Sequence, residues 1–120
     1  MKQRITVEQF NALSEKKKRK LVDLWRPERG DLFYNPERNL VQIVDAASDE
    51  GIESSGELIP KYNCKPLLSI GQMICLIKDL LEEKSGREYY KFGDIIGDIE
   101  VWVLPELCDA LWEEVKISIS

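Results

Sequence analysis

The feature that most constrains the fold is a change of apolar period between residues 30 and 45. Before it, apolar residues recur at helical spacing, whereas Leu32–Tyr34 and Leu40–Val44 are short strand-like runs joined by the turn sequence NPER. A helical segment that leads directly into a hairpin indicates an α+β fold. The second run is apolar on both faces except at Gln42, so we expect it to be a central strand.

Helix-start patterns place the other helices. Thr6 has Gln9 three positions later, and Ser14 precedes a basic run, which predicts one bent helix or two short ones before Gly30. Ser69, with a glutamine three positions later, opens the clearest helix in the chain, and Pro105 suits the first turn of a last helix. The apolar residues predicted to line the two later helices are Ile70, Met73, Ile74, Ile77, Leu80, Leu81, Leu107, Leu111 and Val115.

The remaining segments complete the predicted architecture. Strand-like runs at 88–92 and 99–104 predict a second hairpin, and residues 47–66 are expected to form a polar loop, with a short strand at 57–59 as an alternative. We therefore predict a single α+β domain over residues 1–120, with a small, mostly antiparallel sheet of two hairpins packed with three to four helices.

Composition excludes several kinds of chemistry. The chain of 120 residues has no histidine, which removes the commonest general base, and its three cysteines match no zinc pattern. The longest apolar stretch, at 67–81, is interrupted by Lys78 and Asp79, and polar and basic residues follow Met1, so we expect no signal peptide. We expect a cytoplasmic protein with reduced thiols, no membrane segment, no cofactor and no readable catalytic centre.

Charge is unevenly spread along the chain. The net charge is −5, but residues 1–30 carry nine Lys and Arg against four Asp and Glu, and the remainder carries eight against eighteen. The acidic body argues against general nucleic-acid binding, whose affinity comes from cationic surface that meets phosphates. A basic segment on an acidic body favours self-complementarity, as in a homodimer, or contact with a protein partner.

Three sequence segments together resemble a family of small proteins encoded by phages and prophages of Gram-positive bacteria. They are ITVEQFNAL through WRPERGDLF, PLLSIGQMICLI and ELCDALWEEVK, which span most of the chain. The resemblance implies a phage accessory setting. It implies no activity, cofactor or site, because no function is established for that family.

The basic run from Lys16 to Lys20 is the most conspicuous candidate interaction site. On a helix, five consecutive residues point around the whole cylinder, so only Lys16, Arg19 and Lys20 are expected to share a side. A solvated helix face explains the run most simply. Contact with an acidic partner surface or with nucleic acid are the alternatives.

Further candidates lie near the C-terminus. Arg87, Tyr89 and Lys91 would be the exposed half of a strand that serves a ligand pocket or a protein interface. Trp102 and Trp112 lie partly opposite the predicted core stripes and are candidates for a dimer or partner face.

Two other C-terminal segments are candidates for a cation site and for an edge strand. Asp94, Asp98 and Glu100 would suit a hard cation, although an ordinary glycine-rich connection is the simpler interpretation. The tail at 116–120 alternates like an edge strand and would be able to pair with another chain.

The cysteines have simpler expected roles. Cys64 lies between Lys61 and Lys65, whose charges would lower a thiol pKa, but no base accompanies it and an ordinary loop cysteine is expected. Cys75 and Cys108 are expected to be small core residues.

The leading functional prediction is a non-enzymatic phage or prophage accessory protein that binds a protein partner. A small-ligand-binding protein, with a nucleotide-like ligand near residues 87–92, is the alternative. A carboxylate-metal phosphohydrolase on Asp94, Asp98 and Glu100 is a weaker one.

Overall fold

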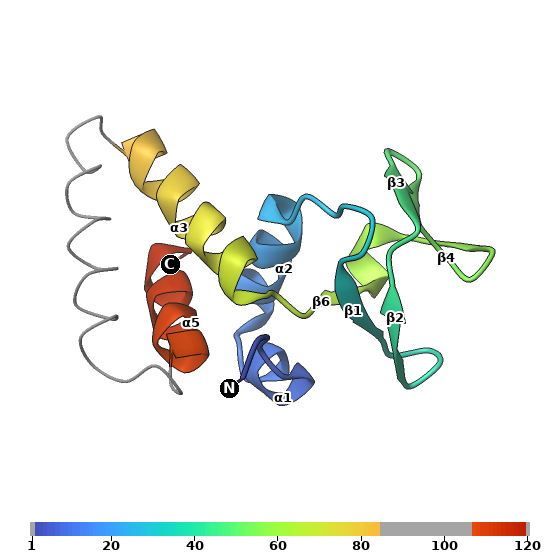
Figure 1. Ribbon diagram of the computed structural model, residues 1–120, viewed down its shortest axis with the longest axis horizontal. Coiled ribbons are helices and arrows are strands. Elements are labelled where there is room, and N and C mark those ends of the chain that lie inside the picture. The colour runs from blue at the N-terminus through green and yellow to red at the C-terminus, as the bar shows by residue number, and fades with distance from the viewer. Residues whose placement is uncertain (1, 85–106, 120) are drawn as a thin grey trace. The chain divides into compact units, whose positions relative to one another are not determined.

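The computed structural model describes residues 2–84 and 107–119 and shows an α+β fold (Figure 1). The chain divides into two compact units, one made of residues 6–67 and the other of residues 1–5 and 68–120. The second hairpin predicted at 88–104 lies outside the described residues. Whether both units behave as the single domain predicted from the sequence stays a prediction.

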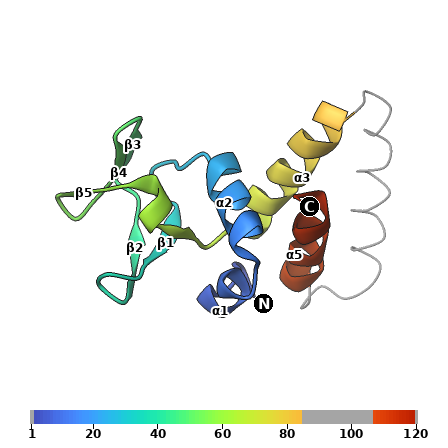
Figure 2. The same cartoon turned by 180° about the vertical axis from the view of Figure 1, so that it is seen from behind.

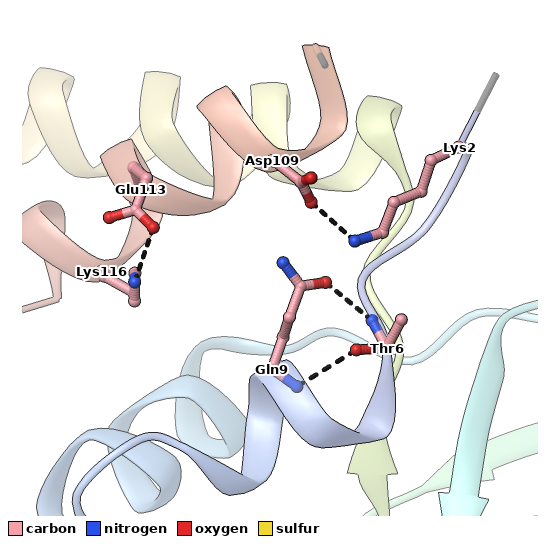
Figure 3. Close-up of polar contacts among 6 residues, drawn as sticks. All are labelled: Lys2, Thr6, Gln9, Asp109, Glu113 and Lys116. Carbon is pink, nitrogen blue, oxygen red and sulfur yellow. Dashed lines mark hydrogen bonds and ion pairs between the residues drawn. The ribbon is translucent and has the colours of Figure 1, made fainter. Parts of the chain in front are cut away.

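The first unit begins with two separate helices, α1 (Val7–Asn11) and α2 (Glu15–Leu24). The Thr6 hydroxyl accepts from the Gln9 amide at 3.2 Å, and the Gln9 side chain accepts from the Thr6 amide at 2.9 Å (Figure 3). Ser14 accepts from the backbone amide of residue 17 at 3.3 Å and so starts α2. Both predicted caps are confirmed, and of the two open alternatives the chain forms two short helices.

A three-stranded antiparallel sheet follows, with strands β1 (Leu32–Asn35), β2 (Leu40–Ile43) and β6 (Lys65–Pro66). The hairpin of β1 and β2 is confirmed, with Phe33 paired to Gln42. The strand order is β2-β1-β6, so β2 lies at an edge and the expectation of a central strand is wrong. The reason is that β1 also pairs with β6, a strand that was not predicted from the sequence, on the side away from β2.

A second three-stranded sheet occupies much of the segment expected to be a polar loop. Its strands are β3 (Ala46–Ser48), β4 (Gly51–Ser54) and β5 (Glu57–Ile59), in that order. Only the short strand at 57–59 was expected here. Gly51 is required in β4, because a Cβ at this residue would lie 2.4 Å from the Ile59 carbonyl oxygen. Figure 2 shows β5 from the opposite side, and a short 3-10 helix, η1 (Lys61–Asn63), follows it.

Buried amides and a hydroxyl link the two sheets. The Asn35 amide donates to the Gln42 side-chain oxygen at 2.7 Å, and the Gln42 amide donates to the Ser54 hydroxyl at 3.4 Å. The Ser54 hydroxyl donates in turn to the Ile43 carbonyl at 2.7 Å. All three polar side chains are buried. Because a buried amide without partners is costly, this network holds Gln42 on the inner face of β2.

In the second unit, helices α3 (Ile70–Lys84) and α5 (Leu107–Ser118) lie side by side in both views (Figures 1 and 2). The predicted cap of α3 is confirmed, since the Ser69 hydroxyl accepts from the Gln72 amide at 3.1 Å. The N-terminal segment joins this unit through an ion pair of Lys2 with Asp109 at 2.6 Å (Figure 3).

The predicted apolar stripes of these helices are largely buried. Of the α3 residues, Met73, Ile77 and Leu80 are buried, and Ile70 and Ile74 are half-buried. The buried residues of α5 are Cys108, Leu111, Trp112, Val115 and, just after the helix, Ile119.

Two expectations for the second unit are wrong. The tail is not an edge strand, because α5 continues to Ser118 and buries Ile119. Cys75 is exposed, because its position on α3 lies away from the buried stripe. Within residues 2–84 and 107–119, no helix is long and apolar enough to cross a membrane.

Candidate functional site

The backbone groups of strand β2 point alternately toward β1 and toward the open edge of the sheet. The Val44 amide donates to the Asp31 carbonyl at 2.8 Å, so the backbone of Val44 points to the β1 side. Backbone groups alternate in direction along an antiparallel strand. The backbone N–H and C=O of Gln42 therefore also point to β1, and those of Val41 and Ile43 point to the open edge. The backbone of Val41 therefore lies at the free edge of the sheet.

The side chains of β2 are arranged with the polar residue inside and the apolar residues outside. Gln42 is only 6% exposed, whereas Val41 and Ile43 are 52% and 55% exposed. Directly paired residues share a face of the sheet, so Tyr34 and Leu32 of β1 lie beside these two side chains. We call Leu32, Tyr34, Val41 and Ile43 the outer sheet face. Val and Ile are unusual at exposed positions of an edge strand, which proteins commonly protect with charge or proline.

The open edge of β2 has unused hydrogen-bonding groups. The Ile43 carbonyl already accepts from the Ser54 hydroxyl. Within the part of the chain that the structure describes, the backbone N–H and C=O of Val41 have no hydrogen-bond partner. The edge therefore offers one donor and one acceptor at a residue whose side chain is apolar and exposed.

The segment that forms the two sheets is rich in exposed acidic residues. Residues 32–66, which hold both sheets and η1, contain six Asp and Glu against three basic residues, so this segment carries a net charge of −3. Arg38 pairs with Glu57, and the other acids have no cationic partner among the described residues. These other acids are Glu37, Asp45, Asp49, Glu50 and Glu53, and all are exposed. The segment that contains the apolar strand is thus negative overall, and Lys65 of β6, whose ammonium lies 5.9 Å from the centroid of the Tyr34 ring, places a cation beside the outer sheet face.

A groove lies elsewhere in the same unit, between α2 and η1. Its volume is about 520 Å³, and the charged residues of its lining are the cations Lys18, Arg19 and Lys65 and the acids Glu15 and Glu37. The Arg19 guanidinium lies 4.9 Å from the centroid of the Tyr62 ring. No acidic side chain forms an ion pair with Arg19 within the described residues. The guanidinium donors are therefore available to an anion at the groove.

Asp23 organises the η1 side of this groove. The Tyr62 hydroxyl donates to the Asp23 carboxylate, and this hydrogen bond is the main cause that raises the pKa of Tyr62. The Lys61 ammonium donates to the Asp23 backbone carbonyl at 3.4 Å, and partial burial lowers the pKa of Lys61. These contacts hold the Tyr62 ring below Arg19.

Cys64 also lines the groove, but its thiol is not activated. Burial raises the pKa of Cys64 to about 12, which is opposite to the effect expected from the neighbouring lysines. The reason is that Lys61 is directed to Asp23, and the Lys65 ammonium bonds to the Asn11 side chain at 2.7 Å. The thiol stays protonated at neutral pH, as an ordinary buried cysteine does.

The comparisons with known proteins give no relative. No model of a protein family, no curated protein and no solved structure matches the chain. The resemblance to phage and prophage proteins therefore stays a prediction, and the geometry of the described residues is the basis for a function.

The structure describes three of the side chains proposed from the sequence as partner-binding residues. Lys16 and Lys20 are exposed on α2, together with Arg19, as helical spacing predicts. Trp112 is only 2% exposed, so its expected place on a partner face is wrong. The reason is that α5 buries a stripe through Cys108 and Trp112, one residue beyond the predicted one.

The other proposed site residues lie outside the described residues. They are Arg87, Tyr89, Lys91, Trp102, Asp94, Asp98 and Glu100. Among the residues that are described, no cluster of His, Cys, Asp and Glu is able to hold a metal ion. The cation site at 94–100 and the ligand site at 87–92 stay predictions.

The outer sheet face was missed by sequence reasoning. The sequence feature that could have indicated this face is Gln42, the single polar residue within an otherwise apolar strand. A lone polar residue in a strand indicates either a solvent-facing side or a buried hydrogen bond. Asn35, which pairs across the hairpin from Leu40, was the available partner for the second possibility.

Proposed function

We propose that this chain is a non-enzymatic protein-binding module and that the outer sheet face is its interface. One observation carries the proposal: β2 buries its polar residue and exposes Val41 and Ile43 at an open edge. Exposed apolar strands with unpaired edges are commonly completed by another polypeptide. The absence of histidine and the raised pKa of Cys64 agree with a role that needs no nucleophile.

The proposed setting is the cytoplasm of a bacterial host, where the chain acts as a phage or prophage accessory protein. The resemblance of its sequence segments to that family supports this setting. A partner that covers the outer sheet face would remove apolar side chains from water, and each would contribute roughly 1 kcal/mol or more if it became buried.

The test is capture of proteins from an extract of a Gram-positive bacterium on the immobilised full chain. The double variant Val41→Thr with Ile43→Thr keeps strand-forming, β-branched residues but removes the apolar surface. The matched control is Ile117→Thr, which alters a side chain that is 66% exposed on α5.

We expect the same partner to bind the unaltered chain and the Ile117→Thr control and to be lost from the double variant. Unfolding curves establish that all three proteins are folded. If a properly folded double variant captures the same partner, the outer sheet face is not the interface.

A second candidate function is binding of a small anionic, nucleotide-like ligand in the groove beside α2. The observation that favours it is the Arg19 guanidinium held over the Tyr62 ring without an acidic partner among the described residues. This location replaces residues 87–92 as the place to look first, because it is a described groove of suitable size.

A thermal-shift panel of nucleotides and other phosphorylated compounds tests the groove. Arg19→Gln is expected to abolish any stabilisation that the panel reveals, and Lys20→Gln, which changes an adjacent exposed cation outside the groove lining, is expected to retain it. Equal loss in the two variants would indicate general charge attraction instead of a site.

A further inference from the structure

We infer that the partner adds an extended, cationic segment as a new strand at the open edge of β2. This inference rests on the proposed function and specifies the partner's chemistry. It follows from the open backbone groups of Val41, the exposed apolar side chains beside them and the negative charge of the surrounding sheets.

Strand addition uses the groups that β2 leaves open. An antiparallel segment placed beside the strand would receive a hydrogen bond from the Val41 N–H and donate one to the Val41 C=O. The Ile43 carbonyl already accepts from the Ser54 hydroxyl, so Val41 is the central contact residue. Alternate apolar side chains of the added strand would lie beside Val41 and Ile43 on the outer sheet face.

Charge determines which segment fits. The segment at residues 32–66, which holds both sheets, carries a net charge of −3 even with Lys65, which lies over the Tyr34 ring, and its unpaired acids are exposed. A twofold pairing of β2 with a second copy would bring two such sheets together, and like charges at an interface oppose association. A segment with lysine or arginine on both sides of a few alternating apolar residues would instead complement the surface. The occupant is therefore a cationic strand of another protein.

The experiment is a nuclear magnetic resonance titration of the isotope-labelled full chain with two synthetic peptides. Both peptides have the same alternating Val and Thr centre, and one is flanked by lysines and the other by glutamates. We expect the lysine peptide to shift the Val41 and Ile43 amide resonances to saturation, and the glutamate peptide to bind at least about ten-fold more weakly. Added salt should weaken the lysine peptide's binding.

Two variants make the test specific. Val41→Pro removes the outward N–H, which has no partner among the described residues, and also fixes the φ angle there; it is expected to abolish binding of the lysine peptide. Asp45→Asn with Glu53→Gln keeps the size of two exposed side chains and lowers the negative charge, so affinity should fall several-fold. If Val41→Pro fails to fold, the exchange rate of the Val41 amide with and without the lysine peptide tests the same hydrogen bond, because pairing with an added strand would slow it.

The outcomes separate this inference from the proposed function. Equal binding of both peptides, or binding of neither, overturns the cationic strand. Concentration-dependent shifts of Val41 and Ile43 without peptide also overturn it, because a second copy would then occupy the edge. In each case, loss of a captured partner in the Val41→Thr and Ile43→Thr variant would still support the outer sheet face as an interface.

Discussion

Helix α5 and strand β2 treat their apolar residues in opposite ways. In α5, Leu111 and Val115 are fully buried, as their helical spacing predicts. In β2, Val41 and Ile43 are more than half exposed, and the polar Gln42 is buried between them. Both segments are rich in apolar residues, so hydrophobicity alone does not decide which side chains a protein buries.

The difference teaches that hydrogen bonding determines the orientation of β2. A slip by one residue would exchange the two faces of a strand and bury Val41 and Ile43. It would also remove Gln42 from Asn35 and Ser54, which are themselves buried. The network therefore accounts for the exposure of Val41 and Ile43, and the proposed binding role would cover these two side chains.

The largest expected effect lies on the α5 side of the comparison. Leu111→Ala should lower the free energy of unfolding by about 2–5 kcal/mol, because it leaves a cavity at a fully buried position. Ile117→Ala, at the most exposed large apolar side chain of the same helix, should change it by less than about 0.5 kcal/mol. Urea unfolding measures both, and equal effects would show that α5 is not packed as described.

The second-largest expected effect is in β2, where replacing a polar residue by an apolar one is expected to destabilise the fold. Gln42→Val should lower the free energy of unfolding by about 1–3 kcal/mol, because the Asn35 amide loses its buried acceptor. The neighbouring change Val41→Gln should cost less than about 0.5 kcal/mol, since this side chain is exposed. A stabilising Gln42→Val substitution would contradict the role given to the network.

A smaller effect concerns pH. The folded chain raises the pKa of Cys64 from its ordinary value of 9.0 to about 12, so its contribution to stability is complete below pH 9 and is lost as the pH rises toward 12. Between pH 8 and pH 10, the unaltered chain should lose about 1.4 kcal/mol more unfolding free energy than Cys64→Ala. The same loss in both proteins would mean that the thiol is not buried.

Helices were more predictable than strands in this chain. The capping residues Thr6, Ser14 and Ser69 predict where their helices begin, because capping depends on residues close in sequence. The second sheet and β6 are held by pairings such as Ile52 with Ile59 and Phe33 with Pro66, which local patterns do not specify. The outer sheet face was not predictable for the same reason, since the buried position of Gln42 depends on Ser54 from another sheet.

The most direct test of the open β2 edge is amide hydrogen exchange of Val41 and Gln42 in the purified chain. Alternation along the strand directs the Gln42 N–H to the Phe33 carbonyl and leaves the Val41 N–H outside the sheet. We expect the Val41 amide to exchange much faster than the Gln42 amide. Equal, strong protection of both amides would show that the edge is already paired, and would contradict the proposal that β2 awaits a partner strand.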